Sequence, residues 1–142
     1  MSEITVNGKN SEFEFVPHDL TDASSEQLAK EIAKILWHKK ARGIKVLKVV
    51  DHTVLTDYFV ICSGTSNTQI RGLAGEVEYQ LSLCGVKPHG MEGYNEASWV
   101  LVDYTHVIVH IFNRDTRDFY KLEKLWSEAE EIDISDVLPL DD

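Results

Sequence analysis

The sequence lacks the features of membrane proteins and of disulfide-stabilised proteins. No apolar run approaches the roughly 18 residues that a membrane-spanning helix needs, and the first residues do not show the order of a secretion signal. Only two cysteines are present, Cys62 and Cys84. Both lie in apolar surroundings, which favours free, buried and reduced thiols. We therefore expect a cytoplasmic protein without disulfides and without a membrane partner.

Basic residues are also scarce. The chain has 14 lysines and arginines against 24 aspartates and glutamates, and its formal net charge is -10. Residues 51–113 contain seven acidic residues and only two basic ones, Arg71 and Lys87. Such a surface repels a phosphate backbone, so we expect little or no direct nucleic-acid binding. Seven basic residues lie between positions 30 and 48; a solvated helix face explains them, with an RNA-touching edge as the minority interpretation.

Patterns of catalytic and metal sites are missing as well. The sequence contains no CxxC or GxSxG pattern and no cysteine with an evident histidine and asparagine partner. His106 and His110 are four residues apart, but the apolar run between them predicts a strand. At about 3.3 Å per residue their imidazoles lie roughly 13 Å apart, too far to share a metal. We expect a protein that is not an enzyme and that needs no metal and no cofactor.

Residues 55–77 predict a strand, a tight turn and a helix, and the rest of the chain is organised around them. Residues 58–62 form an apolar run rich in aromatic and β-branched side chains, typical of a strand buried on both faces. Ser66, followed three residues later by Gln69, predicts a capping box at the helix start, and Gly85 can end the helix. The expected apolar stripe comprises Ile70, Leu73, Ala74, Val77, Leu81 and Cys84.

The turn at residues 64–66, Gly-Thr-Ser, admits two interpretations. Exposed amides at a helix start can hold an anion, which makes a phosphate cradle one interpretation. We favour a turn that only caps the helix, because the spacing matches neither GxxxxGK[ST] nor GxGxxG. With Glu76 and Glu78 the turn superficially resembles a nucleotidyltransferase, but residues two apart on a helix diverge by about 200° and cannot hold one metal pair. Nucleotide binding or nucleotidyl transfer at Gly64, Thr65 and Ser66 stays the alternative function.

The remaining patterns predict a single α/β (α+β) domain with a mixed sheet of four to five strands packed by helices. Its architecture is expected to be nucleotidyltransferase-like, without the catalytic acids. Ser24 and Gln27 predict the start of a first helix, which Gly43 stops, and strands are expected at 46–50, 98–103 and 107–112. Residues 87–95 are expected to be mostly loop. Asn113 can cap a last helix whose expected apolar face is Phe119, Leu122, Leu125, Trp126 and Ala129.

The two ends of the chain are expected to differ from this domain. Residues 1–23 read as an extension, either a hairpin around Asn7 and Gly8 or a loose segment. Residues 24–126 hold the domain. Residues 127–142 contain seven acidic residues and no basic one, so this tail is expected to be frayed or disordered.

The segment Trp99-Val100-Leu101-Val102-Asp103-Tyr104 carries the most unusual surface. On a strand, Trp99, Leu101 and Asp103 share one face, and the two valines share the other. Valines suit burial under a helix, which leaves a tryptophan, a leucine and a carboxylate outside, as in a protein interface. The alternative is that Trp99 packs into the core or forms a dimer contact.

Three segments resemble the ribosomal silencing factor family, also called RsfS or Iojap. They are LTDYFVICSGTS, MEGYNEASWVLVDYTHVIVHIF and RDFYKLEKLW, in that order, within residues 24–126. The resemblance implies a translation repressor that binds the large ribosomal subunit through its universal protein number fourteen and blocks subunit joining under nutrient limitation. A homodimer off the ribosome stays open. By resemblance, the interface residues are Glu92, Trp99, Leu101, Asp103 and Tyr104, with His110 and Phe112 as neighbours on the partner strand.

Overall fold

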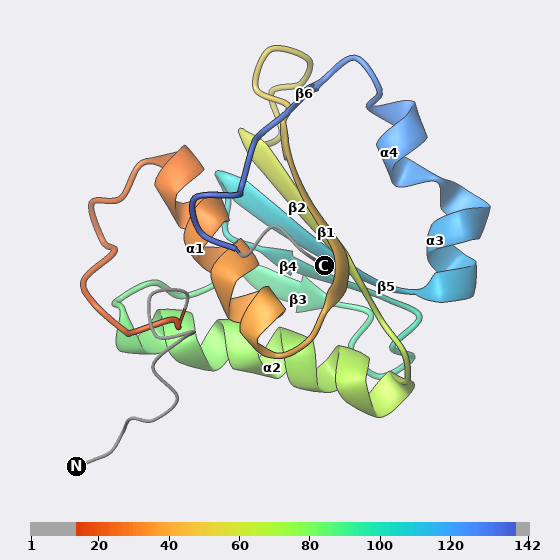
Figure 1. The fold of residues 1–142 in the computed structure, drawn as a ribbon, viewed down its shortest axis with the longest axis horizontal. Coiled ribbons are helices and arrows are strands. Elements are labelled where there is room, and N and C mark those ends of the chain that lie inside the picture. Colours follow the sequence, from red (N-terminus) through yellow and green to blue (C-terminus); the bar gives the residue numbers. More distant parts are fainter. Residues whose placement is uncertain (1–13, 139–142) are drawn as a thin grey trace.

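Strand β2, Tyr58–Gly64, lies inside a six-stranded mixed sheet with the order β3-β4-β5-β2-β1-β6 (Figure 1). The computed structural model describes residues 14–138, so the hairpin expected around Asn7 and Gly8 lies outside the described part. Strand β2 is parallel to β5 and antiparallel to β1, and β4 is antiparallel to both β5 and β3. The other strands are β1 Arg42–Lys48, β3 Gly90–Glu92, β4 Trp99–Asp103, β5 Val107–Asn113 and β6 Glu130–Glu131.

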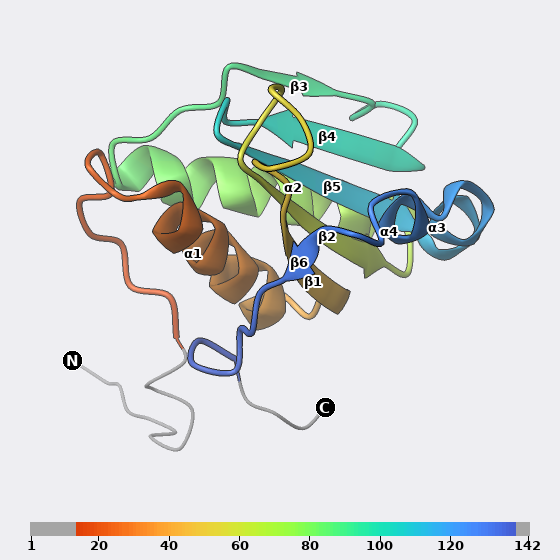
Figure 2. The ribbon, with the colours of Figure 1, turned by 90° about the horizontal axis from the view of Figure 1, so that it is seen from above.

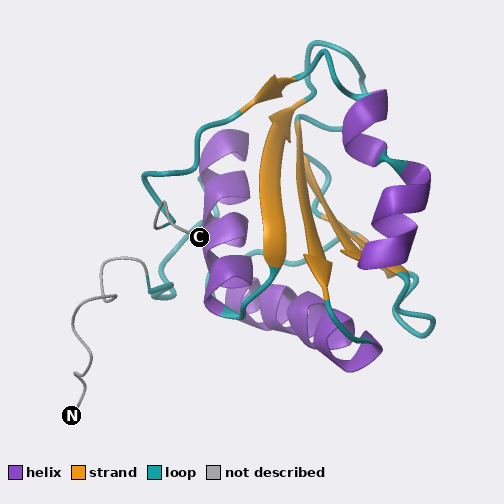
Figure 3. Cartoon of the chain, turned by 45° about the vertical axis from the view of Figure 1, so that its right-hand side comes forward, coloured by secondary structure: helices purple, strands orange, loops and turns teal. Residues whose placement is uncertain are grey.

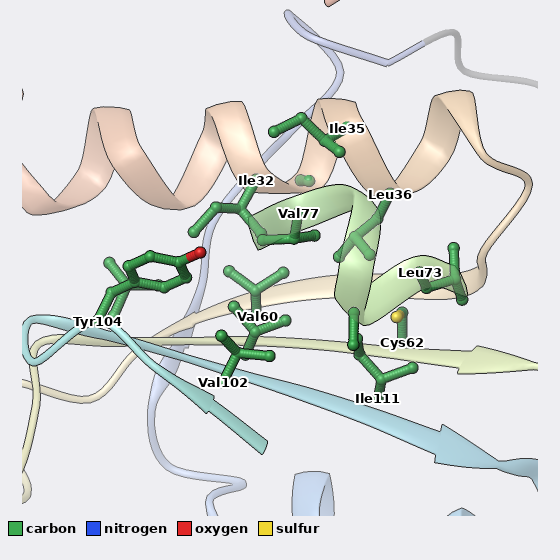
Figure 4. Close-up of a cluster of buried hydrophobic side chains, with 14 of the residues drawn as sticks. Ile32, Ile35, Leu36, Val60, Cys62, Leu73, Val77, Val102, Tyr104 and Ile111 are labelled. Carbon is green, nitrogen blue, oxygen red and sulfur yellow. The ribbon is translucent and has the colours of Figure 1, made fainter. Parts of the chain in front are cut away.

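Two long helices, α1 (Ser25–His38) and α2 (Asn67–Leu83), cover one face of the sheet. Figure 2 shows them side by side on that face. Their predicted caps form: Ser24 Oγ accepts the Gln27 amide over 3.1 Å, and Ser66 Oγ accepts the Gln69 amide over 3.0 Å. The core beneath them joins valines and isoleucines of the strands to the apolar stripes of both helices (Figure 4). This face is the main hydrophobic core, and its burial drives folding.

The opposite face, which we call the second face, is only partly covered. Figure 3 shows α3 (Arg114–Tyr120) and α4 (Leu122–Leu125) across the sheet from the two long helices. Leu122 packs with Phe59, Ile61 and Phe112 in a smaller core, which Trp126 borders. The short helices therefore cover β5, β2 and β1, while the part of the second face on β4 stays open.

The single mixed α+β domain is confirmed, but the count of four to five strands was too low. The two additional short strands lie in segments that were expected to be irregular. β3 lies within residues 87–95, and β6 lies in the acidic tail and pairs with β1. The tail also packs: Leu138 is buried, and the Ile132 amide donates to the Val46 carbonyl over 2.8 Å. The sparse apolar side chains of the tail hold it against the core, so its described part is ordered where fraying was expected.

The expected last helix is broken into two. Asn113 caps α3, since its Oδ1 accepts the Thr116 amide over 2.8 Å. Lys121 then adopts a left-handed conformation with φ of 48°, which ends α3 and starts α4. This break turns Phe119 and Leu125 outward to 77% and 75% exposure, so they do not share one buried face with Leu122.

Candidate protein-binding face

The open part of the second face carries a strip of apolar and acidic side chains. The register pairs Leu101 of β4 with Glu92 of β3 on one side and with His110 of β5 on the other. Trp99 and Asp103 flank Leu101 on the same face of β4, because side chains alternate along a strand. We name the half-buried or exposed side chains of this region the β4 strip: Glu92, Trp99, Leu101, Asp103, Phe119 and Tyr120.

Trp99 is the centre of an aromatic cluster within the β4 strip. Its ring centroid lies 4.8 Å from that of Phe112 below it and 5.0 Å from that of Tyr120 on α3. Tyr120 in turn contacts Phe119 edge to face at 5.0 Å. Tyr120 is 50% exposed and Phe119 is 77% exposed. A continuous aromatic surface therefore runs from β4 onto α3, and aromatic side chains are enriched at the centres of protein interfaces.

Phe119 and Tyr120 were not recognised as surface residues in the sequence. The helical period predicts Phe119 on the buried face of the last helix and gives no role to Tyr120. Their exposure follows from the break at Lys121, where the chain turns after α3. The sequence has no glycine or proline at this position to indicate a turn. Helical periodicity alone therefore predicts an unbroken helix.

Asp103 has a structural contact in addition to its charge. Its Oδ1 accepts the Thr105 amide over 2.7 Å, at the turn between β4 and β5. Thr105 lies in the left-handed region, with φ of 74°. The carboxylate therefore stabilises this strained turn, in the manner of an Asx turn, while it stays half-buried beside Leu101.

Three of the predicted interface residues present almost no surface. Tyr104 is 6% exposed, His110 is 4% exposed and Phe112 is fully buried. Tyr104 lies on the face of α1 and α2, within the main core, where Figure 4 shows it near Ile32 and Val77. In this conformation a partner cannot contact these three side chains directly. Glu92, Trp99, Leu101 and Asp103 keep positions at which a partner can reach them.

Arg117 of α3 holds the short helices against the sheet. Its Nη2 and Nε donate to Glu123 Oε2 over 2.7 and 3.0 Å, and Nη1 donates to Ser63 Oγ over 2.8 Å. Nη2 also donates to the Gly43 carbonyl over 2.8 Å, which ties α3 to β1. Burial raises the pKa of Glu123, but the hydrogen bonds and charge of Arg117 outweigh burial and lower the pKa below its usual 4.5. The position of Tyr120 on the β4 strip depends on this anchored helix.

Replacing Arg117 with methionine should lower the free energy of unfolding by roughly 2 kcal/mol, because half-buried charge-assisted hydrogen bonds are lost. The effect should depend on pH. A carboxyl whose pKa is lower in the folded state stabilises the fold above its unfolded pKa, and that stabilisation is lost as the pH falls through the folded pKa. Urea titrations at pH 7 and pH 3.5 should therefore show a larger gap between parent and Arg117→Met at pH 7. An equal gap at both values would contradict the role of Glu123.

The turn at Gly64 acts as a cap in the structure. Gln69 Oε1 accepts the Thr65 amide, and Ser66 Oγ accepts the Gln69 amide, so two amides at this helix start are already satisfied. A cleft of about 760 Å³ lies beside the turn, between the starts of α2 and α3. Glu76 lies on α2, where its carboxylate accepts a hydrogen bond from Gln80 over 2.7 Å.

Within residues 14–138, no three histidine, cysteine, aspartate or glutamate side chains are grouped so as to hold a metal ion. Over the same part of the chain, none of the helices has the length and apolarity needed to cross a bilayer.

Comparison with known proteins identifies the family. The family model described as "Ribosomal silencing factor during starvation" (RsfS) matches residues 22–141, which extends past Trp126, where the resemblance was expected to end. The ribosomal silencing factor RsfS of Bacillus subtilis is 42% identical over 106 residues, which cover 75% of this chain and 90% of the relative. The "Mitochondrial assembly of ribosomal large subunit protein 1" of mouse is 33% identical over 99 residues, or 68% of this chain and 43% of the mouse protein.

The fold agrees with this match. A crystal structure of a Chromobacterium violaceum protein superposes with a TM-score of 0.71 at 33% sequence identity, covering 73% of this chain and 87% of that one. A crystal structure of a Bacillus halodurans protein gives a TM-score of 0.64 at 34% identity, covering 76% and 95%. Sequence and fold therefore lead to the same conclusion: the chain belongs to the ribosomal silencing factor (RsfS) family.

Proposed function

We propose that this protein binds the large ribosomal subunit, blocks its joining to the small subunit and so represses translation when nutrients are limited. The observation that carries the proposal is the family match over residues 22–141. The name of the mouse relative, which refers to assembly of the ribosomal large subunit, supports the choice of subunit. The proposed contact is the universal ribosomal protein number fourteen, a basic protein.

The β4 strip is the surface that we propose for this contact. It combines exposed aromatic rings with two carboxylates, Glu92 and Asp103, on a chain whose formal net charge is -10. Aromatic anchors supply binding energy when a partner desolvates them. Acidic groups around them attract and orient a basic partner and speed association. A ribosomal protein can offer that basic surface, whereas bare ribosomal RNA would be repelled.

The purified protein should sediment with isolated large subunits in a sucrose gradient and should reduce the formation of whole ribosomes from separated subunits. Binding should weaken as salt rises past physiological strength, because part of the attraction is between exposed charges. The measurement is the protein bound per subunit across a salt series, with light scattering to follow subunit joining.

Preferential sedimentation with the small subunit would contradict the proposal. Nucleotidyl transfer with magnesium and a nucleoside triphosphate, lost in Glu76→Ala, would instead support the alternative enzyme. Tyr79→Ala is a matched control for surface changes, because Tyr79 is an aromatic residue of α2 with 58% exposure on the other side of the sheet. Its sedimentation should equal that of the parent.

A further inference from the structure

His110 lies under the Trp99 indole and is joined to it by a hydrogen bond. The Trp99 Nε1–H donates to His110 Nδ1 over 3.1 Å, and the two ring centroids are 5.9 Å apart. The imidazole is almost fully buried, whereas the indole is half-buried at the surface. His110 therefore acts on a partner indirectly, and Trp99 is the surface side chain to which it is hydrogen-bonded.

The apolar surroundings of His110 keep its imidazole neutral. The Phe59 ring stands edge-on at 4.7 Å, and the Phe112 ring lies nearly parallel at 6.2 Å. These neighbours supply no charge, and burial lowers the pKa of His110 to about 4. The imidazole is therefore neutral at pH 7 and has one acceptor nitrogen. That acceptor is Nδ1, which Trp99 uses, so the proton of the neutral ring is on Nε2.

The hydrogen bond adds a directional constraint on the Trp99 indole. Ring contacts with Phe112 and Tyr120 keep the indole against the sheet, but they contain no directional hydrogen bond. Only the edge with Nε1–H can donate to His110, so the bond selects a single ring orientation. A side chain that is already ordered loses less conformational entropy when a partner binds.

We propose that His110 is a positioning residue, which fixes the Trp99 indole in one orientation on the β4 strip through the hydrogen bond from Nε1–H to Nδ1. The gain in binding rests on the proposed function, whereas the fixed orientation of the indole does not. His110 thus acts through Trp99 and not through the direct contact that the family resemblance implies, and this role gives a reason for a polar ring in a buried position among aromatic residues.

The test compares His110→Phe with His110→Asn in the full chain. Phenylalanine keeps a ring among the aromatic neighbours but cannot accept, whereas asparagine places an amide oxygen near the position of Nδ1. The first readout is the Trp99 indole N–H signal in a nitrogen-15 correlation spectrum, assigned by its loss in Trp99→Phe. Its exchange with solvent should be about tenfold faster or more in His110→Phe and close to parental in His110→Asn.

The second readout is sedimentation with large subunits. His110→Phe should bind about three- to tenfold more weakly, and His110→Asn should bind within about twofold of the parent. An unchanged indole signal in His110→Phe, or binding equally weak in both variants, would overturn the proposal. If the parent itself does not bind large subunits, the proposed function fails, and the indole signal still decides the role of His110. Should His110→Phe fail to fold, His110→Leu serves as the apolar variant.

Discussion

Replacing Trp99 with alanine should weaken binding to the large ribosomal subunit by about thirtyfold or more, equivalent to about 2 kcal/mol. Trp99 is the ring that joins the sheet part of the β4 strip to α3, and interface energy concentrates in central aromatic residues that a partner desolvates. The variant removes the indole and exposes the Phe112 ring beneath it. Co-sedimentation at several protein concentrations measures the loss.

Stability must be measured beside binding, because Trp99 is half-buried and packs on Phe112 and Tyr120. We expect a loss of about 1 to 2 kcal/mol in the free energy of unfolding, which lies within the common range for single substitutions and leaves the protein folded at 25 °C. Tyr79→Ala should change neither quantity appreciably. A folded Trp99→Ala variant that sediments like the parent would place the interface elsewhere on the domain.

The face of β4 could be predicted from the sequence because strand periodicity is a local property. Alternation placed Trp99 and Leu101 opposite the valines of the same strand, and the structure buries those valines under α1 and α2. The same alternation places Tyr104 on the valine side, in the core. Its proposed interface role came from resemblance, and the period of two would have assigned it to the core.

Which part of the second face is covered could not be predicted in the same way. It depends on the path that the chain takes across the sheet after β5. Residues 119–129 satisfy a helical period, yet Lys121 adopts φ of 48° and turns the chain so that Leu122 covers Phe112. The three-dimensional path of this segment is needed to show that His110 and Phe112 are buried and do not reach the surface. For the acidic tail, the average composition predicts fraying. It does not reveal the few apolar residues that pack the tail against the domain, among them Leu138.

The β4 strip lies on a rigid support. The sheet fixes the backbone of β4, the helices α3 and α4 support one end of the β4 strip, and Arg117 ties α3 to the sheet. Binding constellations are most exact when their side chains are locked by the packing of a rigid scaffold. The buried residues under the β4 strip should therefore matter for stability first and for binding second.

Phe112→Ala should lower the stability of the fold more than it lowers binding to the large subunit. Phe112 is fully buried, its ring contacts Trp99 at 4.8 Å, and it shares the smaller core with Leu122. Removing a buried phenylalanine ring costs about 3 to 5 kcal/mol in lost burial and cavity formation. Because a domain has only about 5 to 15 kcal/mol of stability, the thermal midpoint should fall by more than about 10 °C.

The Phe112→Ala variant should bind large subunits more weakly only because fewer molecules are folded and because the β4 strip has lost the ring beneath it. Chemical denaturation gives the folded fraction, and co-sedimentation at 4 °C compares binding per folded molecule with that of Trp99→Ala. Trp99→Ala should be more stable and bind less, whereas Phe112→Ala should be less stable and keep more binding once the folded fraction is counted. A Phe112→Ala variant that melts like the parent yet fails to bind would mean that Phe112 reaches the partner directly, and that the second face opens on the ribosome.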